Sequence, residues 1–147
     1  MTTTEIVETV TETVVTETVT ETEVAMEYAG EAMVEACARA AHEVNRAYCL
    51  ALGDTSHVPW EEAPEWQKTS ARNGVKALLD DPSMTPEQSH EGWTIEKLRD
   101  GWKYGPEKRP DLKEHPCLVL YNELPIAQRA KDSIFRQVVL EVARAVG

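Results

Sequence analysis

Three short motifs follow one another in the second half of the chain: His-Glu-Gly-Trp at 90–93, Gly-Trp-Lys-Tyr-Gly-Pro at 101–106 and His-Pro-Cys-Leu-Val at 115–119. Glycine directly after a helix is a common stop signal, and Gly-Pro marks a turn. The motifs therefore predict a helix that ends at Gly101 and two short strands, residues 103–104 and 117–121, around a polar loop. We expect these strands to form one small β-hairpin.

A capping box indicates where this helix begins. Thr85 is a candidate N-cap, Pro86 suits the first helical position, and Gln88 stands three residues after the cap. In this arrangement each of the two side chains accepts a hydrogen bond from the backbone N–H of the other residue.

The predicted helix has two faces with aromatic content. At about 100° per residue, one face collects Ile95, Leu98 and Trp102, and the opposite face collects His90, Trp93 and Lys97. We expect the first face to pack in the core and the second to present a partly exposed indole between an imidazole and an ammonium. That composition is typical of a site that stacks an aromatic ring and neutralises a nearby phosphate.

A long first helix is predicted upstream. Its apolar side chains recur at steps of three and four, and Gly53 follows as a C-cap; the repeating residues are Cys37, Ala41, Val44, Tyr48 and Leu52.

Two further helices complete the predicted fold. One starts at Pro64, which suits a first helical turn, and runs to about Leu79. The other follows Pro125, reaches the C-terminus and buries residues such as Ile134, Val138 and Val142. The fold class is mainly α, with about four helices and one small two-stranded β-hairpin.

Residues 1–24 form an acidic arm of Thr, Glu and Val, and residues 25–147 form the predicted helical domain. Such acidic repetition is typical of disorder, because it buries too little apolar surface to offset the entropy of ordering. The alternative is a helical extension that serves in oligomerisation, since Val7, Val10 and Val14 have helical spacing.

Charge and cysteine content narrow the possible partners. The chain has a net charge of −11; nine of its 26 acidic residues lie in residues 1–35, which hold no Lys or Arg, so the rest carries 17 acidic against 15 basic residues. Without a basic stripe, a nucleic acid polymer is not an expected partner. Three cysteines without a Cys-x-x-Cys pair and the absence of a long apolar run favour a cytoplasmic protein that does not enter the membrane.

In its order of motifs, roughly residues 38–145 resemble the repeat domain that occurs in tandem pairs in ryanodine receptors and singly in small bacterial and bacteriophage proteins. The resemblance implies four helices and a hairpin. In the receptor relatives, the Trp of His-x-x-Trp belongs to a cleft between paired repeats, where an adenine nucleotide can lie between aromatic rings. It thus implies a stacking role for Trp93, with Lys97 and the basic loop at 103–109 nearby. Because this chain holds one repeat, a homodimer is the natural way to build a two-sided clamp.

These observations predict a non-enzymatic domain that binds a nucleotide-like small molecule. The candidate ligand-binding residues are His90, Trp93, Lys97, Tyr104, Lys108, Arg109 and Trp60. Tyr104 could instead only fix the turn after the helix, and Trp60 could close a pocket or only hold its loop. If the gene is viral, its expected use is to sequester a host signalling nucleotide in the host cytoplasm. The alternative is a protein-interaction module that uses the acidic arm, the first helix and the Trp face.

Catalytic and metal chemistry have little support in the sequence. Cys117 and His115 are two residues apart, but the intervening Pro116 and the apolar residues that follow favour a buried structural thiol. The four histidines show no i, i+4 pair, and there is no glycine-rich phosphate loop. We therefore expect no catalytic residue, no metal site and no cofactor.

Overall fold

The computed structural model describes residues 20–147, without the side chains of residues 22–29. The predictions for the acidic arm fall outside the described residues, except that helix α2 (Glu21–Ala51) already begins at its end. The chain divides into two compact units, residues 1–30 and residues 31–147. The second unit contains all the features described below.

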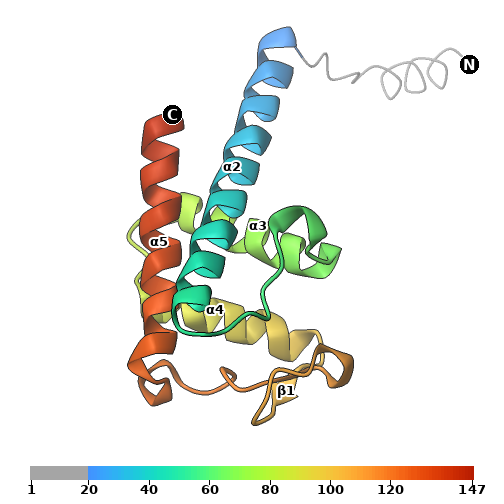
Figure 1. Cartoon of the computed structure of the whole chain (residues 1–147). Coiled ribbons are helices and arrows are strands. Elements are labelled where there is room, and N and C mark those ends of the chain that lie inside the picture. Colours follow the sequence, from blue (N-terminus) through green and yellow to red (C-terminus); the bar gives the residue numbers. More distant parts are fainter. Residues whose placement is uncertain (1–19) are drawn as a thin grey trace, which may run out of the picture. The chain divides into compact units, whose positions relative to one another are not determined.

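The second unit is mainly helical, as the sequence predicts. It holds the greater part of α2, followed by α3 (Glu65–Asp80), α4 (Pro86–Arg99) and α5 (Ile126–Val146), with 3-10 turns η1 (Trp60–Glu62), η2 (Pro110–Leu112) and η3 (Tyr121–Glu123) between them. Figure 1 shows α5 running beside α2, with α4 crossing below them. Among the described residues, no helix combines the length and apolar character needed to cross a membrane.

Local signals set the helix ends where the sequence predicts them. The Thr85 hydroxyl accepts a hydrogen bond from the backbone N–H of Gln88 at 3.2 Å, and the side-chain oxygen of Gln88 accepts one from the backbone N–H of Thr85 at 2.9 Å. Gly53 and Gly101 follow α2 and α4 with φ of 86°, a left-handed conformation that glycine adopts without a steric penalty.

The core forms where small side chains of α2 meet larger ones. Its buried residues are Cys37, Ala38, Ala41, Trp60, Val75, Leu78 and Val139. The Cys37 thiol donates to the carbonyl oxygen of Val139 at 3.6 Å, which brings α2 and α5 close together. Of the regularly spaced apolar residues on and after α2, Cys37 and Ala41 are buried, whereas Val44 and Leu52 are exposed. On α5, the residues expected in the core are partly buried around fully buried Val139.

The small sheet is parallel, so the prediction of a hairpin is wrong in its pairing. Strand β1 (Lys103–Tyr104) pairs with β2 (Glu114–His115), with Lys103 opposite Glu114 and Tyr104 opposite His115. The second strand ends before residues 117–121, because Pro116 has no N–H to continue a ladder. The intervening loop returns through an antiparallel bridge between Arg109 and Glu114.

Gly105 allows the two strands to approach. A Cβ at this position would lie 2.7 Å from the Cβ of Glu114 and 2.4 Å from its Oε2 atom. Any larger residue would therefore push β2 away from β1.

Trp93 is partly buried, in agreement with the predicted partly exposed indole, but the other α4 residues of the two predicted faces are reversed. His90 and Lys97 are each only 4% exposed, whereas Ile95 and Leu98 are each 56% exposed. Trp102 is buried, as predicted, but it lies beyond the turn at Gly101 and no longer follows the helical spacing. The polar face of α4 is buried because its side chains have specific partners in the folded unit. Counting apolar residues along the helix does not reveal such partners.

Candidate functional site

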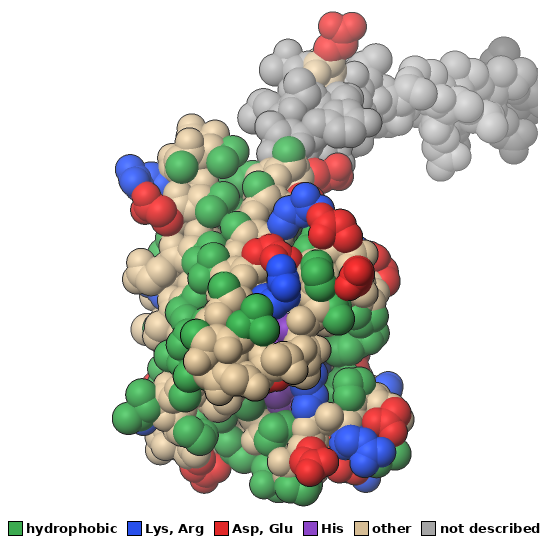
Figure 2. All heavy atoms as spheres, in the orientation of Figure 1, with side chains coloured by type: hydrophobic (Ala, Val, Ile, Leu, Met, Phe, Trp, Pro, Cys, Tyr) green, Lys and Arg blue, Asp and Glu red, His purple; other side chains and the backbone are tan. Residues whose placement is uncertain are grey.

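A cavity of about 410 Å³ lies within the second unit, and all four histidines of the chain line it: His42, His57, His90 and His115. We call it the histidine cavity. It opens to the surface, and Figure 2 shows histidine side chains (purple) set back between other atoms, beside Lys or Arg side chains (blue). The site therefore gathers residues that are far apart in the sequence.

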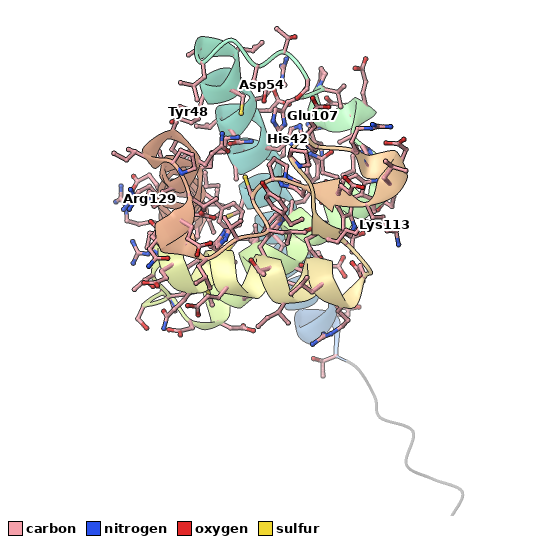
Figure 3. The ribbon with its side chains drawn as sticks, turned by 90° about the horizontal axis from the view of Figure 1, so that it is seen from below. His42, Tyr48, Asp54, Glu107, Lys113 and Arg129 are labelled. Atoms are coloured by element: carbon pink, nitrogen blue, oxygen red, sulfur yellow. The ribbon has the colours of Figure 1, made fainter. Side chains whose placement is uncertain are left out.

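Four different elements deliver these histidines. His42 points inward from α2 (Figure 3), and His57 comes from the loop after it. His90 lies in the first turns of α4, and His115 ends β2. The cavity thus depends on the packing of the whole unit.

Aromatic rings stack around Trp93 on one side of the cavity. The Trp93 and His90 rings are stacked, with centroids 5.6 Å apart and planes 29° from parallel. The His115 ring meets Trp93 edge-on, with a centroid distance of 5.0 Å and an interplanar angle of 75°. The Trp93 indole thus packs against two imidazoles at the wall of the cavity.

Backbone carbonyls fix the protons of two imidazoles. The Nε2 atom of His42 lies 2.7 Å from the Val58 oxygen, and that of His90 lies 2.8 Å from the Val119 oxygen. Because a carbonyl oxygen only accepts, both Nε2 atoms must carry the hydrogen. In the neutral ring, Nδ1 is then left as an acceptor.

The carboxyl group of Asp132 lies beside His90, with Oδ2 3.8 Å from Nδ1. Burial raises the pKa of Asp132 to about 6, against the opposite pull of the charges on His90 and Lys131. The carboxyl group therefore gains a proton at mildly acidic pH, where an exposed aspartate would not.

His115 is held neutral. Burial, followed by the nearby charges of Lys108 and Lys131, lowers the pKa of His115 to about 4. Its Nδ1 atom accepts a hydrogen bond from the Cys117 N–H at 3.0 Å. Burial and Lys108 also lower the pKa of His57. At neutral pH, both rings are hydrogen-bonding groups without charge.

Two lysines bring positive charge to this site. Lys131 lines the cavity. Lys108 is an exposed residue outside the cavity lining, and desolvation followed by the charge of Lys131 lowers its pKa. Lys108 also interacts electrostatically with Asp54, whose negative charge partly offsets this effect.

The structure brings together only part of the predicted site. Trp93 and His90 line the cavity, and the Lys108 ammonium acts on its histidines. Lys97 is buried elsewhere, with its Nζ 4.7 Å from the ring centroid of Trp66 and 5.2 Å from that of Trp102.

The other three predicted residues lie outside the cavity lining. Tyr104 is 57% exposed on β1, and Arg109 is exposed and paired with Asp111. Trp60 is 2% exposed in the core, where its Nε1 donates to a carboxylate oxygen of Glu35 at 3.2 Å. Whether any of the seven residues contacts a ligand stays a prediction.

Sequence reasoning missed His42, His57, Lys131 and Asp132, and it considered His115 only as the partner of a cysteine. These residues share no spacing that would join them on one helix or strand. Lys131 and Asp132 are neighbours in the sequence on α5, and this adjacent pair of opposite charges is the only sequence signal they give. The contact of Asp132 with His90 is a tertiary one.

Comparison with protein families matches the RyR domain to residues 78–147. This part of the chain belongs to the RyR domain family. The match contains α4, the small sheet and α5, and it therefore includes Trp93, His90 and His115. His42 and His57 precede it, so the histidine cavity combines an RyR domain with the segment before it.

Proposed function

We propose that the second unit binds a small molecule with an aromatic ring and a negative charge, most simply a nucleotide, in the histidine cavity. The observation that carries this proposal is the convergence of Trp93, four imidazoles and Lys131 on one cavity, with Lys108 acting electrostatically on two of its histidines. Trp93 and the rings beside it provide a surface for a base. Lys131 and Lys108 provide the charge that a phosphate group requires.

The size and the lining of the cavity agree with such a ligand. Its volume of about 410 Å³ falls in the range of small-molecule sites. The Ser89 hydroxyl is buried, has no hydrogen-bond partner among the described residues and belongs to a residue of the lining. A buried hydroxyl without a partner costs stability, and a bound polar molecule would remove that cost.

Electrostatics favour an anion over a cation in the cavity. The neutral His57 and His115 add no charge, while the Lys108 and Lys131 ammoniums repel each other. A phosphate between the two lysines would replace this repulsion with two attractive interactions.

We propose that the domain binds without catalysis. Burial raises the pKa of the Cys117 thiol, and the neighbouring His115 uses Nδ1 to accept the Cys117 N–H. The thiol therefore stays protonated and has no base to activate it.

A cytoplasmic binder without catalysis withdraws its ligand from solution. If the gene belongs to a bacteriophage, the proposed use is to sequester a host signalling nucleotide. With one RyR domain per chain, we also propose a homodimer, which would place two Trp93 clusters in one assembly. Sedimentation of the free and ligand-bound protein tests this point, and a monomer in both states would contradict it.

A thermal-shift screen tests the proposed binding. The panel contains mono-, di- and cyclic nucleotides and ADP-ribose derivatives, each beside its uncharged nucleoside. A ligand at about 100 times its dissociation constant adds about 2.7 kcal/mol of stability. We expect the phosphorylated compounds to shift the melting temperature and the nucleosides to do so less.

Matched variants test whether the shift in melting temperature arises from binding in the histidine cavity. Lys131→Met should weaken binding by about tenfold or more, because a hydrogen bond to a charged group contributes about 1.5–3 kcal/mol. Lys76→Met removes the same side chain from an exposed position on α3 and should leave binding unchanged. Trp93→Ala should abolish binding, with circular dichroism to confirm the fold. No shift with any nucleotide, or equal loss in both lysine variants, would contradict the proposal.

An interaction module remains the second candidate function. The specific observation that favours it is the exposure of large apolar side chains at the C-terminal end of α2 and in the turn after it: Val44, Leu50 and Leu52. The Trp face of α4 points inward, so a partner would meet α2 instead. Loss of a partner after Leu50→Ser, with nucleotide binding absent, would favour this function.

A further inference from the structure

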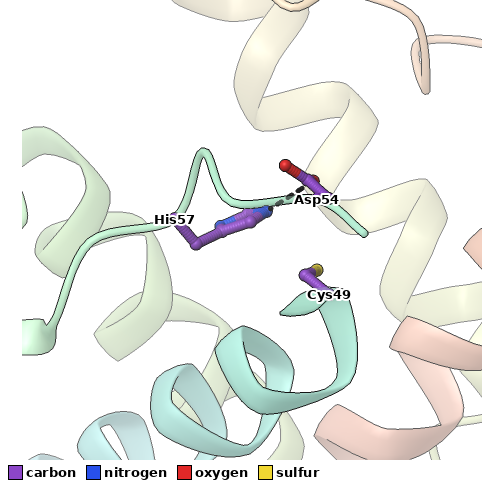
Figure 4. Close-up of side chains that lie close together, drawn as sticks. All are labelled: Cys49, Asp54 and His57. Atoms are coloured by element: carbon purple, nitrogen blue, oxygen red, sulfur yellow. Dashed lines mark ion pairs between the residues drawn. The ribbon is translucent and has the colours of Figure 1, made fainter. Parts of the chain in front are cut away.

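A second cluster of chemically active side chains lies where α2 ends. Cys49 is in the last turn of α2, and Asp54 and His57 are in the loop that follows (Figure 4). One ligand atom from each residue lies within 4.8 Å of the others. We propose that these three residues bind a divalent transition-metal ion, with Zn²⁺ as the best match.

The local backbone brings the three groups together. The turn at Gly53, with φ of 86°, reverses the chain after α2, and the Asp54 N–H donates to the Cys49 carbonyl oxygen at 2.9 Å. The loop is therefore tied to the same residue that provides the thiol.

Hydrogen bonds also orient the Asp54 carboxylate. Its Oδ1 atom accepts from the N–H of Ser56 at 2.9 Å and from the Ser56 hydroxyl at 2.6 Å. The other oxygen, Oδ2, faces the His57 ring, 3.5 Å from its Nε2 atom. A carboxylate already held on one oxygen loses little freedom when the other binds a metal.

The spacing agrees with coordination. Two ligand atoms at about 2.0 Å from a tetrahedral zinc ion lie about 3.3 Å apart, close to the observed distance between Oδ2 and Nε2. The sulfur atom needs only a small shift, because all three atoms already lie within 4.8 Å. The Cys49 thiol donates a long hydrogen bond to the Asn45 Oδ1 atom, at 3.9 Å.

The ligand types select the metal. A thiolate and an imidazole suit Zn²⁺ or Co²⁺ and are poor ligands for Mg²⁺ or Ca²⁺. With the thiol deprotonated, the thiolate and the carboxylate together balance the two positive charges of the ion. Three protein ligands leave one position of a tetrahedral ion for water or another molecule.

The Lys108 ammonium competes with a metal at this site. It interacts electrostatically with both Asp54 and Cys49, and Lys131 also acts on Asp54. A dication must therefore bind beside existing positive charge. Removing the Lys108 charge should strengthen metal binding, whereas removing a ligand should weaken it. The cluster precedes the matched residues 78–147, and the inference does not depend on the proposed nucleotide site.

Cobalt titration of the full-length chain, after treatment with a chelator, tests the site. Co²⁺ bound by a thiolate gives a charge-transfer band in the near ultraviolet, and tetrahedral geometry gives visible ligand-field bands. We expect both signals at one equivalent of Co²⁺, and we expect Zn²⁺ to displace them. If neither signal appears, the proposal is wrong.

Single substitutions locate the metal. Cys49→Ser should remove the charge-transfer band, while Cys117→Ser, a thiol outside the cluster, should leave it in place. Asp54→Asn and His57→Gln should weaken Co²⁺ binding by more than about 100-fold, the upper end for losing even an outer-shell partner. These two loop variants keep the test valid if Cys49→Ser does not fold. Lys108→Met should tighten binding. A band that survives the loop variants would overturn the proposal.

Discussion

In two places of the second unit, a lysine charge acts on aromatic or imidazole rings. In the first, which we call the indole clamp, Lys97 lies over the neighbouring rings of Trp66 and Trp102, with its Nζ 4.7 and 5.2 Å from their centroids. In the second, the histidine cavity, the Lys108 ammonium acts on His57 and His115. Burial is the largest cause of the lowered pKa of both lysines.

What differs is how each charge is compensated. The indole faces attract the Lys97 charge, and the acidic neighbours Glu96 and Asp100 raise its pKa against the effect of burial. In the histidine cavity, the second contribution to the lowered pKa of Lys108 is repulsion by Lys131. Acidic neighbours offset part of the effect of burial on both lysines, but a like charge is the second-largest influence only on Lys108. An anion that binds beside Lys108 and Lys131 would relieve this repulsion.

The largest expected effect comes from reversing the charge in the indole clamp. Lys97→Glu places a carboxylate against two indole faces in a buried position, and we expect it to lower the free energy of unfolding by about 3–5 kcal/mol. Urea denaturation measures this change.

Lys97→Met separates the contribution of the Lys97 charge to stability from that of its packing in the indole clamp. It keeps much of the side-chain volume and should cost about 2 kcal/mol, the contribution of a desolvated cation–π contact. Exposed Lys76→Met should change stability by less than about 0.5 kcal/mol. If Lys97→Met were as neutral as Lys76→Met, the clamp would not be a stabilising element.

A pH titration distinguishes two opposed groups of the histidine cavity. His115 has a pKa of about 4 in the folded chain against 6.5 unfolded, so its contribution to stability is present above pH 6.5 and is lost as pH falls toward 4. Asp132 has a pKa of about 6 against 3.8, so its contribution is present below pH 3.8 and is lost as pH rises through 6. Between pH 4 and 6, the two effects largely cancel.

Asp132→Asn removes the titrating carboxyl group of Asp132 and leaves His115 in place. We expect this variant to lose stability more steeply than the wild type as pH falls from 6 to 4, by up to about 1.4 kcal/mol per pH unit. His115→Gln should show the opposite difference from the wild type. Urea denaturation across this pH range measures both slopes, and parallel curves for all three proteins would show that the two groups do not titrate as described.

The sequence predicts the fold best where the interactions are local. The capping box at Thr85 and Gln88 and the turns at Gly53 and Gly101 depend on a few neighbouring residues, and all are found. The parallel pairing of β1 with β2 depends on a loop that folds back through the bridge between Arg109 and Glu114. No local sequence pattern predicts this bridge.

The candidate site was predictable only in part, for a related reason. Helical spacing correctly places His90 and Trp93 on one face of α4, but it cannot say that this face is the buried one. Burial of His90 depends on the Val119 carbonyl oxygen, which lies 29 residues away in the chain. His42 and His57 join the site through tertiary packing alone.

The smallest expected effect tests whether the two lysines differ in kind. Lys108→Met relieves the repulsion by Lys131 and the burial of an ammonium, so it should stabilise the ligand-free protein, whereas Lys97→Met destabilises it. Because Lys108 is exposed and water screens its charge, we expect a gain of less than about 1 kcal/mol. Urea denaturation without ligand detects the sign, and Lys76→Met provides the baseline. A loss of stability would mean that attraction to Asp54 outweighs repulsion by Lys131, which would place Lys108 with Lys97 among the structural cations.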